Sequence, residues 1–116
     1  MIYLASPYSD PDPQVRQYRY ETVTKVASDL MRDGYHVYSP ITHSHPIALD
    51  GGLPTGWDYW EPYDQKMLSI CTSVHVLQLT GWDISVGIAA EIELAEQMQI
   101  PVTFIDPAVR RCLWPV

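Results

Sequence analysis

Short apolar runs alternate with longer segments of helical periodicity along this chain, and this alternation limits the fold more than any other feature. Apolar runs occupy residues 1–5, 35–39, 74–79 and 100–105, each bounded by turn-forming residues. Strands that alternate with helices form a parallel sheet covered on both faces. We therefore expect an α/β fold, specifically a Rossmann-like (flavodoxin-type) three-layer sandwich with a parallel sheet of four to five strands.

Length and composition fit one domain that spans residues 1–116. A chain of 116 residues with 47% hydrophobic content can bury one core, and no boundary, repeat or low-complexity tract divides it. Asp12 and Pro13 predict the start of a long helix, and Asp33-Gly34 predicts its end. Residues 40–56 show no clear periodicity, so we expect a long irregular binding loop there.

The segment 81–91 carries the most chemical information, because it joins an expected strand to an expected helix. Ser85 stands where a helix N-cap belongs, and its oxygen could accept a hydrogen bond from a free backbone amide. Glu91 lies one turn beyond Gly87 on the same helix face. Without a side chain at Gly87, a flat ring or a sugar could approach Glu91. The simpler alternative is that Glu91 is a solvated charge near the positive end of the helix.

Ligands of parallel sheets bind at the carboxyl ends of the strands. In this chain those ends carry residues 5–9, 39–46 and 79–85, and Asp106. Most of the polar residues with potential chemistry fall in these segments. The topology therefore predicts one cleft that includes the 81–91 junction.

The pattern Ser85-x-Gly87-x-x-x-Glu91 after an apolar strand, together with an N-terminal strand and turn over residues 2–6, resembles the nucleoside 2-deoxyribosyltransferase superfamily, which includes deoxynucleotide N-hydrolases. The resemblance spans most of the chain. It is closest to a small bacterial and phage subgroup with Ser-His-Pro-Ile, here residues 44–47, and Gly-Trp-x-x-Ser-x-Gly, here residues 81–87.

The resemblance implies a nucleoside or nucleotide N-glycosidase, acting as a hydrolase or a transferase. Glu91 would be the nucleophile that attacks C1′ of the sugar, and Tyr3 would orient its carboxylate. Serine at position 85 favours a 5′-phosphorylated substrate and hydrolysis. Relatives assemble as dimers or larger rings, so we expect a homodimer or higher homo-oligomer, with the C-terminal segment 113–115 as a possible interface.

The substrate-binding residues expected from strand position and resemblance contact the sugar, base or phosphate. Arg16 and Arg19, three apart on the first helix, could bind a phosphate or could be ordinary surface arginines. The aromatic residues Trp57, Tyr59, Trp60 and Trp82 could stack on a base or could simply be structural. The full expected set is Ala5, Ser6, Pro7, Arg16, Arg19, Ser44, His45, Trp82, Ser85 and Gly87.

The chain departs from the superfamily at Ser73, where related enzymes usually carry an aspartate that protonates or positions the base. A serine hydroxyl cannot replace that acid. Either Asp83 or Asp64 takes over this work, or the base leaves without a strong acid, or the protein binds a nucleotide without cleaving it. Each aspartate also has a simpler interpretation, Asp83 as a helix cap and Asp64 as a surface charge.

His43 and His45 would point to the same side of an extended segment and could begin a zinc site, with Asp50 as a possible carboxylate ligand. No third ligand stands at a recognisable spacing, and the Glu91 mechanism requires no Lewis acid. We expect His36 and His75 to be buried, hydrogen-bonded histidines. We therefore expect no metal and no cofactor.

A formal net charge of −7 argues against a nucleic-acid polymer as partner, because phosphate backbones require many Lys and Arg side chains. A small nucleoside or nucleotide needs only one or two cations. The two cysteines are too few for a disulfide framework, and no apolar run reaches the roughly 20 residues that cross a bilayer. We expect a cytoplasmic protein without a membrane segment. A module that senses or sequesters a nucleotide without turnover remains the alternative function.

Overall fold

A four-stranded parallel sheet forms the centre of the computed structural model, which describes residues 1–108. The strands are β1 (Ile2–Ala5), β2 (Val37–Tyr38), β3 (Ser73–Leu77) and β4 (Val102–Ile105). Their order is β2-β1-β3-β4, and every neighbouring pair is parallel. This order matches the first four strands of the flavodoxin-type sheet, whose order is 2-1-3-4-5. The expected fold class is therefore confirmed, with four strands of the expected four to five.

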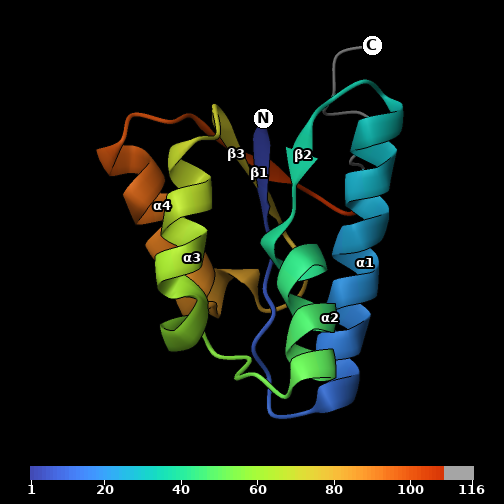
Figure 1. Ribbon diagram of the computed structural model, residues 1–116. Coiled ribbons are helices and arrows are strands. Elements are labelled where there is room, and N and C mark those ends of the chain that lie inside the picture. Colours follow the sequence, from blue (N-terminus) through green and yellow to red (C-terminus); the bar gives the residue numbers. More distant parts are fainter. Residues whose placement is uncertain (109–116) are drawn as a thin grey trace.

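Four helices cover the sheet, two on each face (Figure 1). On one face lie α1 (Pro13–Arg32) and α2 (Pro40–Gly51), which contact each other. On the other lie α3 (Trp57–Ser69) and α4 (Val86–Gln97), which also form a pair. A single 3₁₀ turn, η1 (Trp82–Ile84), precedes α4. The sheet and the helical layer on each of its faces form the expected three layers.

Alternation of side chains along β1 separates the core into two apolar clusters. Leu4 belongs to the cluster beneath α1, together with Leu30. Tyr3 and Ala5 belong to the cluster beneath α3 and α4, together with Leu68. All of these side chains except that of Tyr3 are purely apolar, so burial of the Tyr3 hydroxyl requires a polar partner.

The ends of α1 follow the sequence signals. The side chain of Asp12 accepts a hydrogen bond from the amide of Gln14 at 2.9 Å, and Pro13 occupies the first helical position. Gly34 has a φ of +100°, which an L side chain rarely adopts. The predicted start and end of this helix are confirmed.

The prediction of an irregular loop over residues 40–56 is wrong, because α2 occupies residues 40–51. The side chain of Ser39 accepts from the amide of Thr42 at 3.2 Å, and Pro40 stands at the first helical position. His45 and Ala48 are buried on the inner face. Histidine is a polar residue and Pro46 interrupts the segment, and both features hide the helical periodicity.

On α3, Asp64 and Leu68 are buried, whereas Tyr63 is exposed. His36 is exposed as well. No helix within residues 1–108 is long and apolar enough to span a membrane. The expected interface segment 113–115 lies outside the described residues.

Candidate active site

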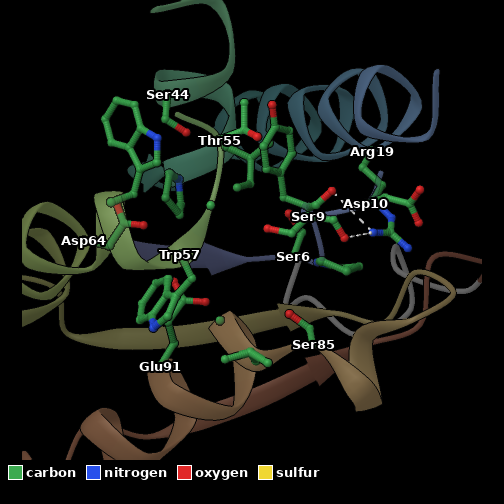
Figure 2. Close-up of a pocket in the computed structure, with 18 of the residues that line it drawn as sticks. Ser6, Ser9, Asp10, Arg19, Ser44, Thr55, Trp57, Asp64, Ser85 and Glu91 are labelled. Atoms are coloured by element: carbon green, nitrogen blue, oxygen red, sulfur yellow. Dashed lines mark hydrogen bonds between the residues drawn. The ribbon is translucent and has the colours of Figure 1, made fainter. Parts of the chain in front are cut away.

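A cavity of about 270 Å³ opens at the carboxyl ends of β1 and β3 (Figure 2). This size is close to the lower end of the range for small-molecule sites, roughly 300 Å³. The loop after β1, the first turns of α2, the first turns of α3 and the η1–α4 junction all contribute side chains. The expected cleft residues that line it are Ser6, Pro7, Arg19, Ser44, Asp64, Ser85, Gly87 and Glu91.

The η1–α4 junction positions Glu91 at the cavity. The hydroxyl oxygen of Ser85 accepts from the amide of Ile88 at 3.2 Å, which confirms the predicted N-cap. Glu91 follows in the second turn and is only 5% exposed. It is therefore a buried carboxyl on the wall of a cavity. The alternative of a solvated surface charge is wrong.

Tyr3 is the hydrogen-bond partner of Glu91. The phenol of Tyr3, fully buried in the middle of β1, donates to Oε2 of Glu91. Burial is the main reason why the pKa of Tyr3 lies well above its ordinary value, and the neighbouring Glu91 carboxylate raises it further. Tyr3 therefore keeps its proton and orients one oxygen of Glu91. The resemblance implied this contact.

Asp64 provides a second buried carboxyl on the cavity wall. It is 6% exposed, and its Oδ1 has no hydrogen-bond partner. Burial raises the pKa of Asp64 to about 7. Burial also raises the pKa of Glu91 to about 8, with the hydrogen bond from Tyr3 opposing this rise and the charge of Asp64 adding to it. Two interacting carboxyls with raised pKa values are a common arrangement in catalytic sites.

Gly87 gives room to an aromatic ring, as expected, but the ring belongs to the protein. A Cβ atom at Gly87 would stand 3.3 Å from Cε3 of Trp57. The indole of Trp57 therefore packs against the first turn of α4, close to Glu91 (Figure 2). Trp57 and Trp60 both line the cavity, whereas Tyr59 and Trp82 do not.

The two arginines of α1 differ in their relation to the cavity. Arg19 lines it and donates to the backbone carbonyls of Ser9 and Thr80, each at 3.1 Å. Arg16 is not among the lining residues, and its guanidinium donates to the carbonyl of Asp10. Both side chains thus tie loops together, and of the two it is Arg19 that places a positive charge on the cavity wall.

Four other expected site residues do not line the cavity. Ala5 is buried within the strand. Asp83 is exposed on η1 and is not among the residues that line the cavity. Trp82 packs on Phe104, with ring centroids 5.5 Å apart. His45 lies behind the cavity, where it contacts Tyr8.

Ser73, the position at which the resemblance implied an aspartate, lies at the end of β3 away from the cavity. It is the first residue of this strand and pairs with Ile2. The cavity opens at the opposite, carboxyl end of the sheet. An acid at position 73 would therefore not reach a ligand in this cavity, and Asp64 is the acid that does line it.

Sequence reasoning missed Asp10, Thr55, Gly56 and Val86, which line the cavity. Asp10 lies just beyond the segment 5–9 expected at the cleft, and Thr55 and Gly56 precede α3 in a segment with no pattern. Tyr8 belongs to the segment 5–9 and lines the cavity, although the sequence indicated no role for it.

His43 and His45 do not point to the same side, because they lie on a helix. The ring of His43 stacks on Tyr63 with centroids 5.2 Å apart, whereas His45 faces Tyr8. Within the described part of the chain, no three His, Cys, Asp or Glu side chains come close enough to hold a metal ion. Asp50, suggested as a third ligand, is exposed at the end of α2.

A comparison with curated protein sequences gives no match. A comparison with protein-family models gives a match over residues 1–106, which includes all four strands, all four helices and every residue that lines the cavity. On this match, the chain belongs to the family described as "Domain of unknown function (DUF1937)".

Proposed function

We propose that this protein is a nucleoside or nucleotide N-glycosidase that uses Glu91 as its nucleophile. One observation carries the proposal: Glu91 is a buried carboxyl on a cavity wall, held by Tyr3 and paired electrostatically with a second buried carboxyl, Asp64. Burial of two carboxyls is unfavourable for folding, and such groups with raised pKa values occur mainly at functional sites.

The chemistry follows from one proton shared by two carboxyls. Between about pH 7 and pH 8 the pair holds roughly one proton, because the two pKa values are raised to about 7 and about 8. The reaction requires the charge on Glu91 and the proton on Asp64. Because Glu91 has the higher pKa, this is the minor arrangement of the shared proton, and the hydrogen bond from Tyr3 to Glu91 increases its share.

In the first step, an oxygen of Glu91 bonds to C1′ of the sugar and the bond from C1′ to the base nitrogen breaks. The electron pair leaves with the base, which takes the proton from Asp64. In the second step, water attacks C1′, the ester to Glu91 breaks, and Asp64 accepts a proton from the water. A second base in place of water would give transfer.

Glu91→Gln tests the proposal. The purified protein is incubated with ribo- and deoxyribonucleosides and their 5′-monophosphates, and the release of free base is measured by chromatography. The amide is a poor nucleophile, so turnover should fall by several orders of magnitude while binding persists. Glu93→Gln is the matched control, since Glu93 is exposed on the same helix. Full activity of the Glu91 variant would remove Glu91 from the mechanism.

A nucleotide-binding module without turnover is the second candidate. The observation that favours it is the pKa of Glu91, which burial raises to about 8, so that a large share of this side chain is neutral at pH 7. A neutral carboxyl is not a nucleophile. Tight binding of a nucleotide with no free base from any member of the same panel would support this function.

The phosphate, the assembly and the location are further parts of the proposal. Arg19 is the positive group on the cavity wall that supports a 5′-phosphate. The resemblance supports a homodimer or larger homo-oligomer. The free thiol of Cys71, the one cysteine among residues 1–108, supports a cytoplasmic location. Equal affinity for a nucleoside and its monophosphate would contradict the phosphate assignment.

A further inference from the structure

Ser44 presents a hydroxyl to the cavity from α2. The residue lines the cavity and is only 6% exposed. Figure 2 shows its side chain directed from α2 into the cavity. A serine side chain ends in its hydroxyl, one atom beyond Cβ, so the group that it brings to the cavity wall is a hydroxyl.

This hydroxyl has no partner within the protein. Thr22, Ser28 and Ser69, which also lie in helices, donate their hydroxyls to backbone carbonyls three or four residues earlier. Such a bond is a common arrangement for serine and threonine inside a helix. The hydroxyl of Ser44 makes no hydrogen bond of this kind, nor any other to the part of the chain that spans residues 1–108. A buried polar group without a partner calls for an explanation, and this one is free to bind a ligand.

Ser44 and Asp64 lie at the same end of the cavity, where α2 meets α3. The residues that precede them, His43 and Tyr63, stack with ring centroids 5.2 Å apart and ring planes 13° from parallel. This stack holds the two helices together beside the cavity, which both Ser44 and Asp64 line. Figure 2 shows these two residues toward one end of the cavity and Arg19 toward the other. The part of a ligand that receives the proton of Asp64 therefore lies next to Ser44.

The wall around Ser44 and Asp64 is mainly apolar. Pro40 and Ile41, about one turn before Ser44 on α2, line the cavity, as does Trp60, one turn before Asp64 on α3. Nε1 of Trp60 donates to the carbonyl of Pro54 at 2.8 Å, so the indole has no hydrogen left for a ligand. Apolar and aromatic walls with a few polar groups are typical of sites that bind a flat ring.

From these contacts we infer that Ser44 is a specificity-determining residue that bonds a keto or amino group of the base. The inference rests on the proposed function, in which Asp64 gives its proton to the departing base and Arg19, at the other end, supports the 5′-phosphate. This orientation places the base between α2 and α3. A hydroxyl can donate to a keto oxygen or accept from an amino group, so Ser44 accommodates both and disfavours a base that has neither.

The test compares bases that differ only in this group. Calorimetry with the Glu91→Gln variant, which should bind without cleaving, gives the affinities of adenosine and inosine 5′-monophosphates and of purine riboside 5′-monophosphate, which has no substituent at C6. Cytidine and uridine 5′-monophosphates and 2-pyrimidinone riboside 5′-monophosphate, which has no substituent at C4, form the pyrimidine set. In the set that binds, the two substituted nucleotides should bind about 3- to 10-fold more tightly than the unsubstituted one. Addition of Ser44→Ala should remove this difference.

Ser44→Ala should leave the fold intact, because alanine is smaller and favours the helix, and urea denaturation checks this. Ser69→Ala is the matched control, since Ser69 is exposed on α3 and its hydroxyl donates to the carbonyl of Lys66. It should leave every ratio of affinities unchanged. The 2′-deoxy analogues separate the base from the sugar, because their affinities relative to the parent nucleotides should be the same with and without Ser44→Ala.

The possible outcomes separate this inference from the proposed function. If neither wild type nor the Glu91→Gln variant binds any of these nucleotides, the proposed function fails, and the role of Ser44 fails with it. If nucleotides bind but substituted and unsubstituted bases bind equally, or their difference survives Ser44→Ala, only the inference is overturned. An effect of Ser44→Ala on the 2′-deoxy ratio alone would also overturn it, because Ser44 would then contact the sugar.

Discussion

Glu91 shows how burial changes the chemistry of a single side chain. In an exposed helix turn this residue would be a weak base with an ordinary pKa near 4.5, yet burial raises its pKa to about 8. Tyr3 partly opposes that rise by donating a hydrogen bond. The same carboxyl thus becomes a group that changes its charge near neutral pH.

The carboxyl pair predicts a bell-shaped dependence of kcat/KM on pH. Activity should be greatest between about pH 7 and pH 8, where the pair holds one proton. Asp64→Asn removes the proton donor and the charge that raises the pKa of Glu91. This variant should lose about 10²- to 10⁴-fold in rate and lose its alkaline limb. An unchanged bell in Asp64→Asn would exclude Asp64 as the acid.

The same raised pKa values predict that stability falls with rising pH. The folded state keeps protons on Glu91 and Asp64 that the unfolded chain releases, so folding is favoured below about pH 4 and progressively less up to about pH 8. Each carboxyl accounts for a few kcal/mol, at roughly 1.4 kcal/mol per pKa unit.

Glu91→Gln should remove part of this dependence, because an amide does not ionise. The stability of the variant minus that of wild type, measured as the free energy of unfolding, should therefore be several kcal/mol larger at pH 9 than at pH 5, at roughly 1.4 kcal/mol per pKa unit. Urea denaturation at the two pH values measures this difference. The exposed Glu93→Gln should give nearly the same difference at both.

At the scale of elements, helix caps decide where the site residues lie. Ser39 is the N-cap of α2 and Ser85 is the N-cap of α4, and each side chain accepts a hydrogen bond from a backbone amide in the first turn of its helix. The cap at Ser85 fixes the start of α4 and thereby the turn on which Glu91 stands. Its hydroxyl therefore has a structural role in the cavity wall.

Ser85→Ala should destabilise the protein by about 1 kcal/mol, because the amide of Ile88 loses its partner. The midpoint of urea denaturation measures this loss. Ser28→Ala is the matched control, since the hydroxyl of Ser28 donates to the carbonyl of Lys25 within its own helix and caps no helix start. Equal effects of the two substitutions would show that the cap contributes nothing specific.

At the scale of the whole molecule, Arg19 connects parts of the chain that are far apart in sequence. From α1 it donates to Ser9 after β1 and to Thr80 in the loop between β3 and η1. A Cβ atom at Gly81 would come within 2.9 Å of this guanidinium, and the φ of Gly81 is +96°. One side chain thus holds the two loops that frame one end of the cavity.

Arg19→Ala should lower the free energy of unfolding by roughly 1–3 kcal/mol, because several charge-assisted hydrogen bonds are lost at a partly exposed position. Arg19→Lys is the second variant, since lysine keeps the charge but has no planar guanidinium that could donate to both loops at once. It should recover less than half of the loss in urea denaturation. Full recovery by lysine would show that charge alone matters.

The sequence by itself determined the elements that depend on local patterns. The apolar runs gave the four strands, Asp12 and Gly34 gave the ends of α1, and Ser85 gave the start of α4, because caps and strand periodicity act over a few residues. It also placed the cleft, since the carboxyl ends of parallel strands share one edge. The resemblance pointed to Glu91 and Tyr3.

Only the tertiary structure decided how these groups act. Residues 40–51 fold as α2 because packing buries His45 and Ala48, which local composition did not indicate. Asp64 joins Glu91 at the cavity and Asp83 does not, because burial depends on how α3 and α4 lie against the sheet. The hydrogen bond between Tyr8 and His45 joins the loop after β1 to α2, and no sequence spacing encodes it. Desolvation and hydrogen-bond direction arise only when distant segments meet.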